Sequence, residues 1–114
     1  MTLKEDIPGS FEQLVLLAVM RLGEDAYGMT VRRELEARTG QPVSLGAVYT
    51  TLERLEKKGY LTSRAAAGGA EREGRARRFF SVEGTGVEAL RRALDVLDRM
   101  RANIPTLSPV GARR

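Results

Sequence analysis

The stretch at residues 44–64, SLGAVYTTLERLEKKGYLTSR, constrains the fold most, because one amphipathic helix leads through a glycine turn directly into a strand. Apolar side chains recur at helical spacing on one face of that helix, at Leu45, Val48, Leu52 and Leu55. Gly59 ends the helix, and residues 60–65 alternate in polarity as a strand does. Residues 74–80, GRARRFF, indicate a basic turn that feeds a return strand. This order is that of a winged helix-turn-helix, so we predict a mainly α fold with a small β-hairpin.

Three further helices are predicted around this stretch. Residues 11–22 form a nearly all-apolar helix, with Ser10 and Gln13 at the spacing of a capping box. Residues 27–39 form a second helix that ends at Gly40, and residues 84–104 form a long last helix that ends before Pro105. We therefore predict a flexible N-terminus (1–9), a winged helix-turn-helix domain (10–83), a C-terminal dimerisation helix (84–104) and a disordered tail (105–114).

Charge and composition narrow the classes of function. The 114 residues include 19 Lys and Arg against 15 Asp and Glu, and this net charge of +4 favours a polyanionic partner. The chain has no Cys and no His, which excludes disulfides, thiolate chemistry, imidazole triads and the usual zinc sites. It also has no Walker-type phosphate loop, so we predict no enzyme activity, no metal and no cofactor. The lack of Cys fits a cytoplasmic protein, and no apolar run is long enough for a membrane span.

The outer face of the 44–58 helix is the first candidate interface. Opposite the apolar stripe, a helical step places small residues toward the N-terminus and basic residues toward the C-terminus, at Gly46, Ala47, Thr50, Arg54 and Lys57. Small residues let the backbone approach base edges in a major groove, where Thr50 and Arg54 can contact bases or phosphates. Ser44 at the helix start and Tyr49 at its flank complete this predicted DNA-binding set. An ordinary solvated helix face has a similar composition, so the helix alone leaves both interpretations open.

The hairpin provides a second, basic element. Four arginines, at positions 72, 75, 77 and 78, lie within seven residues beside several glycines. Arginine forks suit phosphate oxygens, so we predict DNA contacts from Arg72, Arg75 and Arg77. Strand alternation sends Arg77 and Arg78 to opposite faces, so not all four can reach DNA. A groove-sized helix followed by a basic wing favours DNA binding over a solvated surface.

The last helix carries an apolar seam that points to dimerisation. Val87, Leu90, Leu94 and Leu97 recur at heptad-like spacing, and Met100 widens the stripe. Packing onto the same subunit would explain such a stripe, but three other helices already close the core. The helix at residues 11–22 is apolar nearly all round, so we also predict Leu16 at the interface. A homodimer would place two recognition helices for a pseudo-palindromic operator.

These residues resemble the PadR family of bacterial transcriptional regulators over residues 10–100. The resemblance rests on YGMTVRREL, SLGAVYTTLERLEKKGYLTSR and GRARRFFSVEGTG, in this order. Tyr49 with Leu52 matches the recognition-helix pattern, and the aromatic pair after Gly74-Arg75 matches the second strand. Departures are Ala76 where Pro is common, Phe79 and Phe80 where Tyr is usual, and Glu83 where Thr often caps the last helix. Gly86 keeps its expected place.

The resemblance implies a short-form family member with one C-terminal helix. It implies a dimeric repressor that binds double-stranded DNA and is released by a small-molecule effector or another signal. Some short-form members bind flat drugs between the last helices with a Trp, and this chain has no Trp, so we predict no effector residues. Repression is favoured over activation by the resemblance alone.

Two further classes of function compete with DNA binding. A winged-helix protein-interaction module would use the same surfaces on a protein partner and would lack salt-dependent DNA affinity. The basic wing argues against it. An enzyme is the third class, and the absence of His and Cys argues strongly against it.

Overall fold

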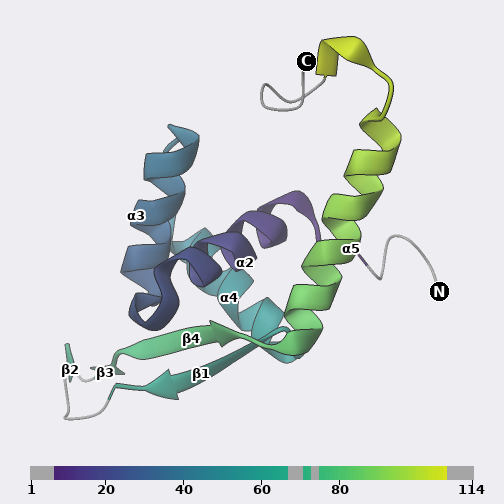
Figure 1. Ribbon diagram of the computed structural model, residues 1–114. Helices are drawn as coiled ribbons and strands as arrows, with labels where there is room; N and C mark the ends of the chain where they lie inside the picture. The colour runs from purple at the N-terminus through teal and green to yellow at the C-terminus, as the bar shows by residue number, and fades with distance from the viewer. Residues whose placement is uncertain (1–6, 67–70, 73–74, 108–114) are drawn as a thin grey trace.

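The computed structural model describes residues 7–66, 71–72 and 75–107. Its elements are α2 (Ser10–Leu22), the 3₁₀ turn η1 (Gly23–Asp25), α3 (Gly28–Thr39), α4 (Leu45–Lys57), β1 (Leu61–Ala65), β2 (Glu71–Arg72), β3 (Arg75–Ala76), β4 (Arg78–Val82), α5 (Gly84–Arg101) and the 3₁₀ turn η2 (Pro105–Leu107). The far end of the hairpin, with β2 and β3, projects from the helical body, and α5 rises from the opposite end (Figure 1). The predicted mainly α fold with a small hairpin is confirmed.

The core lies where α2, α3 and α4 meet the base of the hairpin. Its fully buried side chains come from all of these elements and include Val15, Leu16, Val19, Val31, Val48, Leu52, Leu55 and Leu61. The apolar stripe predicted for the 44–58 helix therefore faces inward at three of its four positions, and Leu45 is half-buried. Burial of a Leu or Val side chain contributes about 1.5–3 kcal/mol, so this shared core fixes the position of α4.

The hairpin pairs β1 with β4 in an antiparallel register that runs from Leu61 opposite Val82 to Ala65 opposite Arg78. The Phe80 N–H donates to the carbonyl of Ala26, between η1 and α3, and the Glu83 N–H donates to the Tyr60 carbonyl across the base of the hairpin, both at 2.8 Å. Gly86 in α5 packs so closely on the Tyr60 carbonyl that an added Cβ would overlap it. The start of α5 is thereby locked onto the hairpin.

The start of α2 differs from the prediction. The helix is capped at Gly9, whose N–H donates to the Glu12 carboxylate at 3.0 Å, and not by the predicted pair of Ser10 and Gln13. The Gln13 side chain instead donates to the Pro8 carbonyl at 2.8 Å. Within the segment predicted to be flexible, Pro8 is buried, and residues 1–6 lie outside the described part of the chain.

The C-terminal end also differs from the prediction. Helix α5 ends at Arg101, after which Asn103 takes a left-handed conformation with φ of 65°. The chain then forms η2 at Pro105–Leu107, where disorder was predicted from residue 105 onward. Short polar residues such as Asn tolerate positive φ, and this allows the turn that brings the chain into η2. The rest of the predicted tail, residues 108–114, lies outside the described residues.

Candidate nucleic-acid interface

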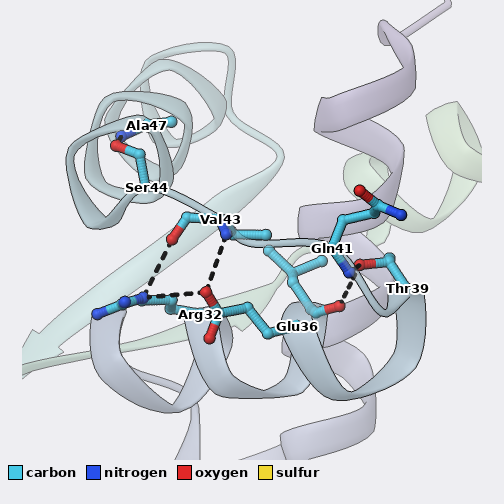
Figure 2. Close-up of polar contacts among 8 residues, drawn as sticks. Arg32, Glu36, Thr39, Gln41, Val43, Ser44 and Ala47 are labelled. Atoms are coloured by element: carbon cyan, nitrogen blue, oxygen red, sulfur yellow. Dashed lines mark hydrogen bonds and ion pairs between the residues drawn. The ribbon is translucent and has the colours of Figure 1, made fainter.

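The outer face of α4 presents the residues that periodicity placed there. Ser44, Gly46, Ala47, Tyr49, Thr50, Arg54 and Lys57 are all exposed. Ser44 is the N-cap, and its Oγ accepts a bond from the Ala47 N–H at 3.1 Å (Figure 2). No side chain larger than Thr stands at positions 46, 47 and 50, so another backbone can approach this half of the helix closely.

The turn before α4 is held by a polar cluster that sequence reasoning missed. The Val43 N–H donates to Glu36 Oε2 at 2.9 Å, and Arg32 Nε donates to the Val43 carbonyl at 3.0 Å. Arg32 and Glu36 also form an ion pair at 3.5 Å. This i,i+4 pair on α3 therefore hydrogen-bonds both the N–H and the carbonyl of Val43, an arrangement that we call the clamp on Val43 (Figure 2). This clamp fixes the residue next to the Ser44 cap. The i,i+4 spacing of Arg32 and Glu36 was the available sequence signal.

Tyr49 lies at the junction of α4 and α3. Its ring stands against Gly28 at the start of α3, so closely that a Cβ at Gly28 would overlap it. The side chain nevertheless stays 44% exposed. Tyr49 therefore does two things: it spaces the two helices of the helix-turn-helix, and it keeps part of its phenol ring accessible at the edge of the exposed face.

The hairpin face away from the core carries a stack of arginine and aromatic side chains. The Arg77 guanidinium lies 4.3 Å from the centre of the Tyr27 ring, Tyr27 meets Phe79 edge-on at 5.2 Å, and Arg64 lies 5.0 Å from the Phe79 ring centre. Cation–π contacts of this kind contribute about 0.5–1 kcal/mol at exposed sites. The half-buried Arg77 is thus held at the N-cap of α3, and its predicted DNA contact stays a prediction.

Arg78 points to the other face and was not among the predicted DNA-binding residues. Its Nη2 and Nε donate to Ser63 Oγ at 2.7 and 3.2 Å, and Ser63 Oγ donates to Glu56 Oε2 at 2.7 Å. This chain of bonds joins β4, β1 and α4, with Arg78 itself exposed. Strand alternation was the sequence signal that Arg78 lies on the opposite face of the hairpin from Arg77. For the predicted Arg72 and Arg75 the structure gives only their backbone pairing, since their side chains lie outside the described part.

Two carboxylates, Glu12 and Glu34, each pair with two basic side chains. Glu12 at the start of α2 is only 7% exposed, accepts bonds from Lys58 Nζ at 3.0 and 3.1 Å, and lies 3.8 Å from Arg54 Nη1. Glu34 on α3 pairs with Arg38 at 2.9 Å and with Arg21 at 3.1 Å. The Arg38 and Arg21 guanidiniums hold the pKa of the Glu34 carboxyl below its usual value. Arg54, a predicted DNA contact, is therefore already paired within the subunit.

The predicted dimer residues divide into two groups. Leu94, Leu97 and Met100 on α5 are exposed by 41, 53 and 73%, and Val87 is half-buried. Leu16 is fully buried and Leu90 is 4% exposed, so their prediction as interface residues is wrong: both lie in the subunit's own core. The buried residues of α5 lie between Gly86 and Ala93, and the positions after Ala93 are half-buried or exposed. An apolar strip on the second half of α5 is thereby left uncovered.

Over the residues that the structure describes, every helix falls short of what a bilayer crossing requires in length and apolar character. Within the same residues, His, Cys, Asp and Glu side chains do not gather in a group that could hold a metal ion.

Comparison with known proteins agrees with this geometry. The profile of the transcriptional regulator PadR-like family matches residues 16–92. A PadR family transcriptional regulator from Eggerthella lenta is 25% identical, with 83% of this chain and 80% of that chain covered and a TM-score of 0.63. A PadR-like transcriptional regulator from Bacillus cereus is 21% identical, with 85% and 89% covered and a TM-score of 0.66. Comparison with curated protein sequences gives no match.

Proposed function

Because the chain belongs to the PadR-like family of transcriptional regulators, we propose that it is a sequence-specific repressor that binds a pseudo-palindromic operator as a homodimer. In this proposal α4 enters the major groove and the hairpin contacts the phosphate backbone. The protein works in the cytoplasm and represses by competing with polymerase for the operator. A small-molecule effector or another signal releases it.

The observation that carries the proposal is the composition of the exposed face of α4. Gly46, Ala47 and Thr50 leave the first half of the helix free of bulk, which a helix needs to reach base edges. The Ser44 cap and the clamp on Val43 hold this half in place, so little order has to be gained on binding. Arg54, Lys57 and the hairpin arginines supply cations around it.

The uncovered strip on α5 supports the homodimer. Leu94, Leu97 and Met100 share one side of the helix, and exposed apolar side chains of this size seldom stand in a contiguous row without a partner. A second copy of α5 offers the same strip and can cover it by two-fold symmetry. Two recognition helices would then lie on one side of the dimer, for two half-sites.

The dimer is tested by Leu94→Glu, which places a charge in the strip. Sedimentation should give a monomer, with operator affinity reduced at least about tenfold because one half-site remains. Arg99→Glu is the control. Arg99 is exposed on a different side of α5 from Leu94, so this substitution should leave the dimer intact. A Leu94→Glu protein that still sediments as a dimer contradicts this interface.

The DNA-binding proposal is tested by titrating the wild-type protein with the DNA upstream of its own gene and with scrambled DNA, over a salt series. Each phosphate contact releases counterions, so affinity should fall steeply with salt, with a slope of several ions. Preference for the upstream fragment would also establish autoregulation. A protein without salt-dependent affinity for any duplex would instead support the competing function, a winged-helix module that binds protein.

A further inference from the structure

The ion pairs at the start of α2 involve the recognition helix itself. Glu12 belongs to α2, whereas Lys58 is the C-cap of α4 and Arg54 stands one turn earlier on the exposed side. The Glu12 carboxylate accepts both of its Lys58 bonds at 3.0–3.1 Å and lies 3.8 Å from Arg54. One nearly buried anion is therefore shared by two cations of the helix that we propose for DNA binding.

Glu12 changes the charge balance of that helix. Residues 45–58 contain three basic side chains (Arg54, Lys57 and Lys58) and two acidic ones (Glu53 and Glu56), which leaves one net positive charge. Glu12 is a third acid at the same place and cancels it. Its position is fixed, because its Oε1 also accepts the Gly9 N–H at 3.0 Å and caps α2. The anion cannot rotate away when DNA approaches without breaking this cap.

We propose that Glu12 limits the affinity of the recognition helix for DNA of any sequence, by competing with phosphate for Arg54 and Lys58. This inference rests on the proposed DNA-binding function. Nonspecific affinity comes almost wholly from cations that neutralise phosphates, so an internal competitor lowers it directly. At the operator, base contacts fix the position of the helix, and its affinity depends less on the two cations. Glu12 therefore raises the ratio by which operator DNA is preferred, which is specificity through a repulsive element.

The direct test is Glu12→Gln, in which the amide oxygen can still accept the Gly9 N–H but the negative charge is gone. Fluorescence anisotropy with a scrambled duplex should show affinity higher by about threefold or more at low salt, and a salt slope steeper by about one ion. Asp95→Asn is the charge-matched control: it removes one carboxylate from an exposed ion pair on α5, 3.1 Å from Arg99, and should have a smaller effect. A purely structural role for Glu12 would change the melting temperature but not the salt slope.

A second comparison keeps the test independent of how well Glu12→Gln folds. In the wild-type background Arg54→Gln should weaken scrambled DNA binding less than Lys57→Gln, because Arg54 is already paired with Glu12. In the Glu12→Gln background, Arg54→Gln should reduce the affinity for scrambled DNA by a larger factor, because Arg54 is no longer paired with a carboxylate. Unchanged affinity and slope in a folded Glu12→Gln protein, or an equal gain in Asp95→Asn, would overturn the inference. If the wild-type protein itself has no salt-dependent affinity for DNA, the proposed DNA-binding function is contradicted, and this outcome is distinct from a failure of the Glu12 inference alone.

Discussion

Helix α4 and the hairpin hold their basic side chains in different ways. On α4, Arg54 and Lys58 share a carboxylate from another helix. The exposed side chains of the half toward Ser44 are uncharged and, apart from Tyr49, small. Residues 64–78 of the hairpin region contain five arginines against two glutamates. Of these, Arg64 and Arg77 lie over aromatic rings and Arg78 is bonded to a serine hydroxyl, and none of these contacts cancels a positive charge.

This difference suggests a division of labour between the two elements. A near-neutral helix with small residues gains little from phosphates and depends on fitting base edges, which differ between sequences. A positively charged hairpin attracts every duplex equally. We therefore expect changes on α4 to alter which DNA is bound, and changes on the hairpin to alter how tightly any DNA is bound.

Thr50→Ala should have the largest effect and should affect only the preferred DNA. Loss of a base contact costs about 1–3 kcal/mol, so affinity for the operator should fall about tenfold while scrambled DNA is bound as before. Anisotropy titrations with both duplexes measure this. Thr62→Ala, an exposed threonine on β1, is the control and should change neither affinity. Equal losses on both duplexes would remove Thr50 from base readout.

Arg78→Gln should have a smaller effect that does not depend on sequence. We expect the exposed Arg78 to contact a phosphate as well, so its removal should weaken operator and scrambled DNA alike, by about threefold, and should reduce the salt slope by about one ion. The same titrations over a salt series give both quantities. Arg91→Gln on the exposed side of α5 removes the same charge and serves as the control. A loss confined to the operator would mean that Arg78 reads bases, and the proposed division would not hold.

Ser63→Ala should have the smallest effect, because it breaks the link from Arg78 to Glu56 without any change of charge. The net loss of a hydrogen bond is about 0.5–1.5 kcal/mol, and we expect a slightly lower melting temperature and an operator affinity reduced by about twofold. The salt slope should stay at the wild-type value. Ser81→Ala, on the other face of the hairpin, is the matched control. A changed slope would show that Ser63 does more than position Arg78.

Local pattern was sufficient to predict the helices and the outward face of α4. The 3.6-residue period separates Val48, Leu52 and Leu55 from Thr50 and Arg54, and the fold obeys it because the stripe has to be buried. Ser44 and Gly59 were predicted correctly as well, since a cap and a positive φ depend on neighbouring residues only. The paired strands followed from alternation in the same way.

Features that depend on tertiary contact could not be predicted. An all-apolar helix does not indicate which side meets its own core, and Leu16 was therefore assigned wrongly to a dimer interface. The N-cap of α2 is Gly9 and not the predicted Ser10. The Glu12 carboxylate accepts hydrogen bonds from both the Gly9 N–H and Lys58, a residue 46 positions away in the sequence. The close approach of Tyr49 to Gly28 likewise joins two helices whose packing no local pattern encodes.

The most direct test of the account is a binding selection from duplexes of random sequence with the wild-type protein. A homodimer with two recognition helices should enrich two inverted half-sites whose centres lie about one helical turn, or a multiple of it, apart. The same selection with Thr50→Ala should lose preference at a matching position in each half-site. Enrichment of no sequence, or of a single unpaired half-site by the wild-type protein, would contradict the proposed sequence-specific dimer.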